Sequence, residues 1–329
     1  MSSYSASSFQ NLCLFKYWGF VVIYNVMFYF IALLIIFIKN VPSSYSAETK
    51  IYALSVNTKA DEDDPYYCLG ARTSIPGRLY FTRKSETGKW DIFWAKFDST
   101  KRTLGKEEMV GAQIESTGDD QTPFVSPEGV FPQWILFSSS KDKPGSPKDI
   151  YVSLRDGPLV SGEERGFGPS RPINEAATSL DESHPWIHDV STKQCFLYFN
   201  KKTEEGLRLF RCQGTKAKGS VPSFAEAKQI EEIPVGFSSP TLTPDGKVMF
   251  LQGQEKDQSH AIFVSYLQMG TWTLPKVIPG LVFENAKRGT KSPRLTRDGK
   301  TLYFSSDRPG GKGGLDIYYV SVSDLQLPK

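Results

Sequence analysis

The chain repeats one pattern five times, and this repeat limits the folds that it can adopt. In each copy a proline opens a short β-prone segment, and a hairpin of two strands around a polar turn follows. The opening prolines are Pro65, Pro123, Pro185, Pro240 and Pro293, at intervals of 58, 62, 55 and 53 residues. The start of the second hairpin strand recurs with a similar period, at Asp91, Asp149, Arg208, Ala261 and Asp316. Two markers with one period indicate a repeat architecture.

One copy holds enough β-prone sequence for four strands. In residues 239–280 these strands are "SPTLT", "KVMFLQG", "AIFVSYLQ" and "WTLPKVIPG". A single four-stranded sheet cannot bury both of its faces, but sheets that are stacked radially cover one another. An aromatic content of 13% suits packing between such sheets. We therefore predict an all-β fold over residues 50–329, a five-bladed β-propeller of four-stranded antiparallel blades.

The fifth copy is too short for a fourth strand, because only "DLQLPK" follows "YYVSVS". The segment "KIYALSVN", residues 50–57, is a predicted strand that precedes the first copy and belongs to none. We expect it to complete the last blade beside residues 316–322. Pairing the first and last segments in one sheet would close the ring.

A glycine-rich stretch in the fifth copy, "LYFSSDRPGGKGGLDIYYV", invites comparison with a phosphate-binding loop. Such a loop needs Ser or Thr after its lysine and then a helix. Here Lys312 is followed by two glycines and a β-branched, aromatic segment, which indicates a strand. The stretch therefore predicts a hairpin turn, and we expect no nucleotide or other cofactor.

The fifth copy, "LTRDGKTLYFSSDRPGGKGGLDIYYVS", closely resembles the WD40-like PD40 repeat of TolB-type β-propellers. Copies two and four are similar to it, and copies one and three are looser. In copy three the Asp-Gly turn is replaced by "HDVSTKQ", and in copy four Ala261 stands where the second strand usually opens with aspartate. The resemblance implies a propeller fold and an exported protein. It implies little about activity, because propellers host many functions.

The N-terminal region differs in kind from the repeats. Residues 17–38 form an uncharged stretch of 22 residues, between a tail of residues 1–16 and a linker of residues 39–49. A helix of this length spans a bilayer core of about 30 Å. We predict one hydrophobic helix, a membrane anchor or uncleaved signal, with the propeller on the extracytoplasmic side. A cleaved signal peptide is the alternative, since small residues at 43–47 would permit cleavage.

Charge and motifs exclude several classes of function. The chain has 39 Lys and Arg against 36 Asp and Glu, a balance that does not predict nucleic-acid binding. Only three histidines occur, and no His-Glu-x-x-His helix or close cysteine pair accompanies them, so we predict no metal site. No Gly-x-Ser-x-Gly motif of a serine hydrolase is present.

Acidic residues precede the opening proline in the first three copies, in "DEDDP", "GDDQTP" and "LDESHP". If the opening strands are innermost, these side chains gather at one mouth of the central channel. The predicted binding residues are Asp63, Asp64, Asp119, Asp120, Asp181, Glu182 and His184.

Two functions fit such a mouth. The first is a membrane-anchored binding or scaffold module for protein or glycan ligands. The second is a carbohydrate-active enzyme, because five-bladed glycosidases use three carboxylates at this place and "DDPYY" is similar to their base-bearing segment. The acids would have neither role if they were ordinary loop residues that cap turns.

Cys195 and Cys212 flank the hairpin of the third copy. If Phe199 lies opposite Arg208, the two cysteines are also directly opposed on one sheet face, where a disulfide can form. The alternative is a pair of small buried apolar side chains.

Overall fold

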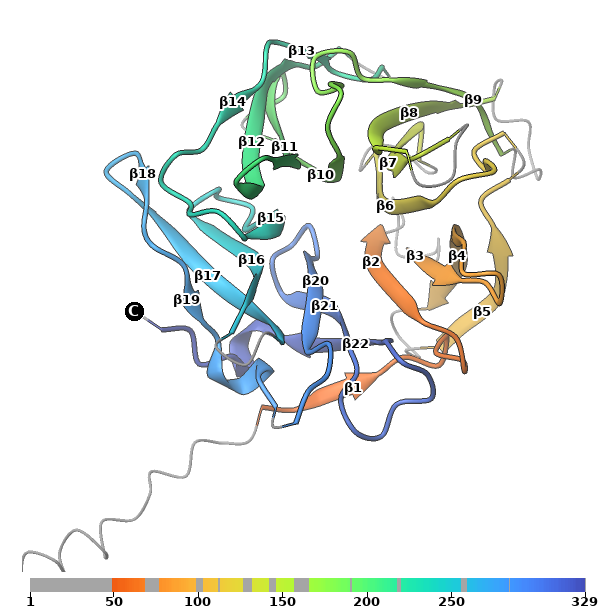
Figure 1. Ribbon diagram of the computed structural model, residues 1–329, viewed down its shortest axis with the longest axis vertical. Coiled ribbons are helices and arrows are strands. Elements are labelled where there is room, and N and C mark those ends of the chain that lie inside the picture. The colour runs from red at the N-terminus through yellow and green to blue at the C-terminus, as the bar shows by residue number, and fades with distance from the viewer. Residues whose placement is uncertain are drawn as a thin grey trace, which may run out of the picture. The chain divides into compact units, whose positions relative to one another are not determined.

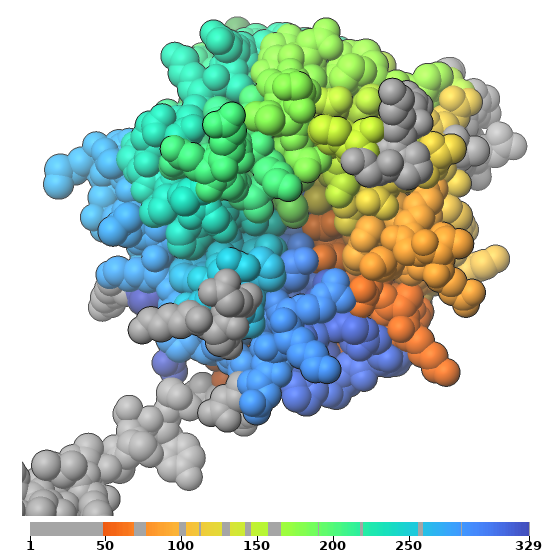
Figure 2. Space-filling model, in the orientation of Figure 1, coloured from red at the N-terminus to blue at the C-terminus, as the bar shows by residue number. Residues whose placement is uncertain are grey.

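The computed structural model describes residues 49–68, 77–98, 103–111, 113–126, 132–141, 146–156, 166–189, 191–217, 220–255, 259–283 and 285–328. These residues form five antiparallel sheets around a central axis, the predicted five-bladed propeller (Figure 1). The opening strand of each sheet is innermost and contacts the opening strands of the blades beside it. Figure 2 shows the blades in contact around the ring.

Each blade has its predicted proline within the opening strand and contains the hairpin that the sequence repeats. Blade one consists of β2 (Glu62–Cys68), β3 (Gly77–Lys84), β4 (Trp90–Asp98) and β5 (Thr103–Met109). Blade two consists of β6 (Asp120–Val125), β7 (Trp134–Ser139), β8 (Asp149–Arg155) and β9 (Phe167–Pro172).

In blades three and four the outermost strand is divided into two short pieces. Blade three consists of β10 (Glu182–Asp189), β11 (Gln194–Thr203), β12 (Gly206–Thr215), β13 (Ser223–Phe224) and β14 (Lys228–Gln229). Blade four consists of β15 (Ser238–Leu242), β16 (Val248–Gln254), β17 (His260–Gln268), β18 (Thr271–Trp272) and β19 (Lys276–Val277). A 3-10 turn, Pro279–Leu281, leads to the last blade.

Blade five is closed by the N-terminal strand, as predicted. Its strands are β20 (Thr290–Leu295), β21 (Thr301–Ser306), β22 (Asp316–Ser321) and β1 (Ile51–Ala53). β1 pairs antiparallel with β22, with Ile51 opposite Val320. The buried side chain of Asn57 extends this pairing, because its amide donates to Ile317 O at 2.9 Å and accepts from Ile317 N at 2.8 Å.

The core repeats with the blades. One position of the second strand in each blade is fully buried, and its occupants are Phe81, Phe137, Phe199, Leu251 and Phe304. Each such side chain contributes about 1.5–3 kcal/mol through the apolar surface that it removes from water. The repeated "LYF" and "ILF" segments of the sequence therefore supply one large apolar residue per blade to the packing between sheets.

Every opening strand also has the same local distortion. The residue before the opening proline has a φ between 49° and 56° in all five blades, and the strand pairing shifts register at that place. These residues are Asp64, Thr122, His184, Ser239 and Ser292. Left-handed backbone is uncommon for residues other than glycine and persists only where the surrounding structure holds it. Because the distortion recurs in all five blades, it is a property of the repeat. The five positions therefore differ only in the side chain that each carries.

No disulfide joins Cys195 and Cys212 in the structure, where both are buried free thiols, the alternative given for them above. The hairpin register is displaced by two residues from the predicted one, so that Cys195 lies opposite Gly214 and Cys212 lies opposite Leu197. The turn is centred on Glu204 and Glu205, and Gly206 follows it with a φ of +126°. In this register the two cysteines are diagonal neighbours on one face of the sheet.

The predicted N-terminal helix, residues 17–38, lies outside the described residues. Among the residues that are described, no helix is long and apolar enough to cross a membrane.

Candidate functional site

The structure divides the acids of the first three blades into three groups. In the first group the carboxylate joins its blade to the preceding one. Asp119 accepts a hydrogen bond from Trp90 N of blade one at 3.1 Å, and Asp181 accepts one from Lys148 N of blade two at 2.7 Å. Asp61, which the prediction did not include, accepts from Leu315 N of blade five at 2.9 Å. These acids hold blades together and are not gathered in one site.

The second group is buried inside the blades. Asp120 accepts from Ser116 N at 2.8 Å, from Ser116 Oγ at 2.9 Å and from Ser139 Oγ at 2.6 Å. Glu182 accepts in the same way from Thr178, and the unpredicted Glu62 accepts from Thr58. The hydroxyl residue lies four positions before the acid in all three blades. This spacing is visible in the sequence and would have indicated a capping role.

Burial shifts the pKa values of the second group. It raises the pKa of Asp120 and raises the pKa of Glu182 to about 7, although hydrogen bonds from Ser116, Ser139 and Thr178 act in the opposite direction. Structural networks of buried ionisable groups also perturb pKa values, so such a shift does not by itself identify a functional residue. The predicted gathering of Asp120 and Glu182 with the other acids is therefore not what the hydrogen bonds show.

The third group, Asp63, Asp64 and His184, lies at the channel, and we call it the Asp64 mouth. His184 Nε2 is 3.6 Å from Asp64 Oδ1, so blades one and three meet across the channel. Thr82 Oγ1 donates to Asp64 Oδ2 at 3.3 Å, and Asp64 N donates to Asp63 Oδ1 at 2.8 Å. Lys291 of blade five lies beside the pair, with Nζ 3.5 Å from Asp63 Oδ2.

The two neighbouring aspartates of the Asp64 mouth have opposite pKa shifts. Burial raises the pKa of Asp64 to about 6, and the charge of Asp63 adds to this effect. Burial alone would also raise the pKa of Asp63, but Lys291 and surrounding hydrogen bonds hold it below its usual value. Burial and the nearby Arg294 lower the pKa of His184 well below its usual value, so its imidazole is neutral at pH 7.

Two basic residues of blade five were missed by the sequence reasoning. Lys291 and Arg294 flank the last opening proline in "TKSPRL", where the other blades carry acidic, neutral polar or aromatic residues. Arg294 is fully buried and stacks over Trp186 at 5.9 Å from the ring centroid. Its Nη1 donates to Pro240 O at 3.5 Å, whereas its Nε and Nη2 have no hydrogen-bond partner among the described residues. The sequence did carry a signal for these two residues, which is a basic side chain within a segment that is otherwise predicted to be a buried strand.

Comparison with solved structures finds glycoside hydrolases of similar fold. The GH43_1 enzyme from Xanthomonas citri complexed with xylotriose has a TM-score of 0.57 and 11% identity, over 83% of this chain and 90% of that one. The RS223 β-xylosidase has a TM-score of 0.57 and 12% identity, over 84% and 98%. The GH62 α-L-arabinofuranosidase of Coprinopsis cinerea has a TM-score of 0.55 and 8% identity, over 85% and 99%. At such identities the likeness shows the propeller fold alone.

The resemblance to TolB receives less support from these comparisons. TolB from Acinetobacter baumannii has a TM-score of 0.43 and 14% identity, over 80% of this chain and 54% of that one, which carries no argument. No family model and no curated protein matches the sequence. The five-bladed propeller is therefore shown, and membership of the PD40 family stays a prediction.

Proposed function

We propose that this propeller binds a carbohydrate at the Asp64 mouth. The observation that carries the proposal is the buried carboxylate of Asp64, whose Oδ1 has no hydrogen-bond partner among the described residues and faces His184 at 3.6 Å. A buried acceptor that lacks a donor costs about 1–3 kcal/mol, which a ligand hydroxyl would recover. The half-buried side chains of His184 and Lys291 reach the surface of the mouth and supply further polar contacts.

Hydrolysis of a glycoside is a second candidate, favoured by the opposite pKa shifts of Asp63 and Asp64 and by the enzymes that share the fold. Carboxyl groups whose pKa values are pushed apart are suited to acid and base roles. However, glycoside cleavage needs carboxyl groups on both sides of the scissile bond, about 5–9.5 Å apart. The other pre-proline positions of the ring are Thr122, His184, Ser239 and Ser292, so Asp64 provides the one carboxylate among these five. Binding without turnover therefore fits the described mouth better.

Titration calorimetry of the full chain with xylo- and arabino-oligosaccharides tests the proposal. We expect Asp64→Asn to weaken binding at least tenfold, because it replaces a charged acceptor with a neutral amide and so removes a charge-assisted hydrogen bond to the ligand hydroxyl. Asp324→Asn is the matched control, since Asp324 is an exposed residue outside the mouth. Equal affinity of the wild type and Asp64→Asn would refute the assignment of the site.

A hydrolysis assay separates the two candidates. Release of sugar from aryl xylosides or arabinosides, lost in both Asp63→Asn and Asp64→Asn, would establish the enzyme. Its pH profile should then have a limb near pH 6, the pKa of Asp64. Binding with no release would leave the binding module.

We also propose that residues 17–38 anchor the propeller on the extracytoplasmic side of a membrane. The support is their uncharged length of 22 residues. Carbonate extraction tests this: the full chain should stay with the membrane, whereas a soluble product with an N-terminus near residue 48 would favour a cleaved signal peptide.

A further inference from the structure

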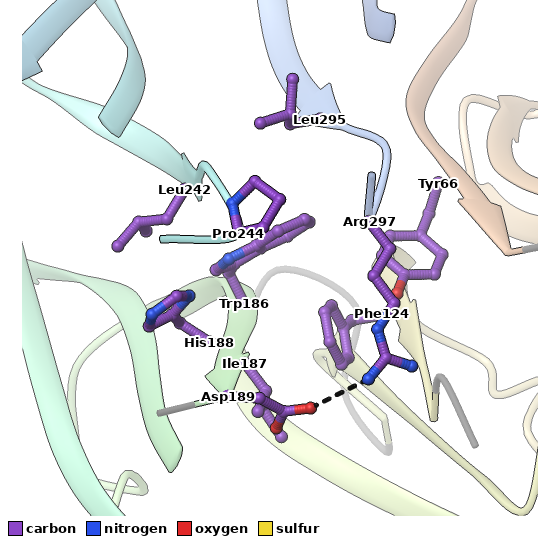
Figure 3. Close-up of a pocket in the computed structure, with 10 residues that line it drawn as sticks. All are labelled: Tyr66, Phe124, Trp186, Ile187, His188, Asp189, Leu242, Pro244, Leu295 and Arg297. Carbon is purple, nitrogen blue, oxygen red and sulfur yellow. Dashed lines mark hydrogen bonds and ion pairs between the residues drawn. The ribbon is translucent and has the colours of Figure 1, made fainter. Parts of the chain in front are cut away.

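A cavity of about 250 Å³ lies farther along the opening strands than the Asp64 mouth. Its lining includes Tyr66, Phe124, Trp186, Leu242, Asp189 and Arg297 (Figure 3). An engineered cavity of about 150 Å³ is known to admit benzene, so this volume accommodates one substituted six-membered ring. Neither the carbohydrate proposal nor the blade joints use this cavity.

The base of the cavity is aromatic because three blades place an aromatic residue directly after the opening proline. The ring centroids of Tyr66 and Phe124 are 4.9 Å apart, and those of Phe124 and Trp186 are 5.4 Å apart. The hydroxyl of Tyr66 is occupied, since it donates to Val125 O at 3.2 Å. This cluster therefore offers a ligand an apolar aromatic surface, with partial positive charge at the ring edges, and few hydrogen-bonding groups.

One donor of this aromatic cluster is unused. Trp186 is 7% exposed, and its Nε1 has no hydrogen-bond partner among the described residues. In Figure 3 the indole nitrogen points to the side of the cavity that His188 and Leu242 line. The guanidinium of Arg294 stacks on the same indole and adds positive charge beneath the aromatic cluster. A buried indole N–H usually has a partner, so a ligand oxygen fits the vacant donor.

An ion pair lies at the rim of the cavity, and an anionic ligand can take the place of its carboxylate. Arg297 Nη2 is 3.4 Å from Asp189 Oδ2, and Figure 3 shows its side chain running past Tyr66 and Phe124 to reach that carboxylate. Asp189 has a second cation, because Lys216 Nζ lies 3.0 Å from its Oδ1. Arg297 can therefore turn to an incoming anion while Asp189 keeps a partner.

We propose that this cavity binds a small cyclic carboxylate. The ring lies against Tyr66, Phe124 and Trp186, and the carboxylate pairs with Arg297, whose planar guanidinium can hold it through two hydrogen bonds. An aromatic acid and a uronic acid share this chemistry. The aromatic cluster favours the aromatic acid, because it offers few partners for sugar hydroxyls.

Ligand-detected NMR and calorimetry on the full chain, with benzoate, D-glucuronate and benzamide as probes, test the proposal. We expect benzoate to bind, and benzamide, which keeps the ring and lacks the charge, to bind at least tenfold more weakly. Arg297→Gln should weaken benzoate binding about tenfold or more. Arg171→Gln, an exposed arginine on β9, is the matched control and should leave it unchanged. Trp186→Phe, which replaces the indole with a smaller ring and so reduces the surface against which the benzoate ring lies, should weaken it about threefold.

Three outcomes would overturn the proposal: no binding of benzoate or glucuronate at millimolar concentration, equal binding of benzoate and benzamide, or full affinity in Arg297→Gln. The comparison of probes uses the wild type and so does not depend on folding of a variant. Tighter binding of glucuronate than of benzoate would assign the site to a uronic acid. Benzoate affinity should be unchanged in Asp64→Asn, which keeps this test separate from that of the Asp64 mouth.

Discussion

Blades one to three differ from blades four and five in the side chains that join them to the preceding blade. In the first three blades an aspartate accepts a backbone N–H of the neighbouring blade, as Asp119 does from Trp90. In the last two the acceptor is an amide on the preceding blade, since Asn200 Oδ1 accepts from Ser239 N at 2.9 Å and Gln252 Oε1 accepts from Ser292 N at 3.0 Å. Most of the acids that look like a catalytic cluster are therefore joints and caps.

The difference teaches how to interpret carboxylates in a repeat. An acid that accepts hydrogen bonds from its own blade or from the preceding one is part of the architecture. Asp64 differs from the others, because its Oδ1 has no hydrogen-bond partner among the described residues and faces a histidine across the channel. Four predictions test this distinction.

Removal of an architectural acid should have the largest effect. Asp120→Ala deletes three hydrogen bonds and leaves Ser116 N and Ser139 Oγ buried without their acceptor. We expect the free energy of unfolding to fall by about 4 kcal/mol, because three hydrogen bonds to a charged acceptor are lost and their donors are left unsatisfied. Chemical denaturation measures it. The folded variant should still bind carbohydrate, and a loss of affinity without a loss of stability would return Asp120 to the site.

The ionised side chain of Asp64 should destabilise the folded protein, whereas the hydrogen bonds of Asp120 should stabilise it. Its pKa in the folded protein, about 6, is raised above the unfolded value of 3.8, so the wild type loses stability as pH rises from about 4 to about 6. Two pKa units correspond to at most about 3 kcal/mol. Asp64→Asn lacks this ionisation, and its stability relative to the wild type should rise by up to that amount over the same range. Denaturation at pH 4 and pH 7 checks the sign, and a parallel pH dependence of the two proteins would contradict it.

Removal of the Asn200 amide, which joins blades three and four, should lower the free energy of unfolding less than removal of the Asp120 carboxylate. Asn200→Ala leaves Ser239 N without its acceptor and Phe237 O without its donor, which lies at 3.1 Å. We expect a loss of about 2 kcal/mol. Asn200→Asp restores the acceptor and removes the donor, so its loss should differ from that of the alanine variant. Equal stability of Asn200→Ala and the wild type would show that the amide does not join the blades.

The fold was predictable from the sequence, because backbone pairing and apolar packing repeat with the prolines. The unassigned strand 50–57 could be placed because one blade lacked a strand and closure of a ring demands it. The site was less predictable. Glu62 directly precedes Asp63 and Asp64 in "DEDDP", yet it is bound by Thr58 inside the blade, whereas the two aspartates lie at the channel. Arg294 escaped notice because it occupies the position of Tyr66 and Trp186 in other blades, where a strand residue is expected to be apolar.

The smallest effect is expected from an acid outside the joints. Glu205 lies in the turn of the third hairpin with its side chain 68% exposed, and it pairs with Arg208 on the same turn. Exposed pairs of this kind contribute little because water and salt screen them and two flexible side chains must be ordered. Glu205→Ala should therefore change the free energy of unfolding by less than about 0.5 kcal/mol, and 0.5 M salt should reduce the difference further. Denaturation of both proteins at low and high salt measures it. If Glu205→Ala lowered the free energy of unfolding nearly as much as Asp120→Ala, the exposure of an acid would not show whether it stabilises the fold. The distinction between architectural acids and other acids would then be wrong.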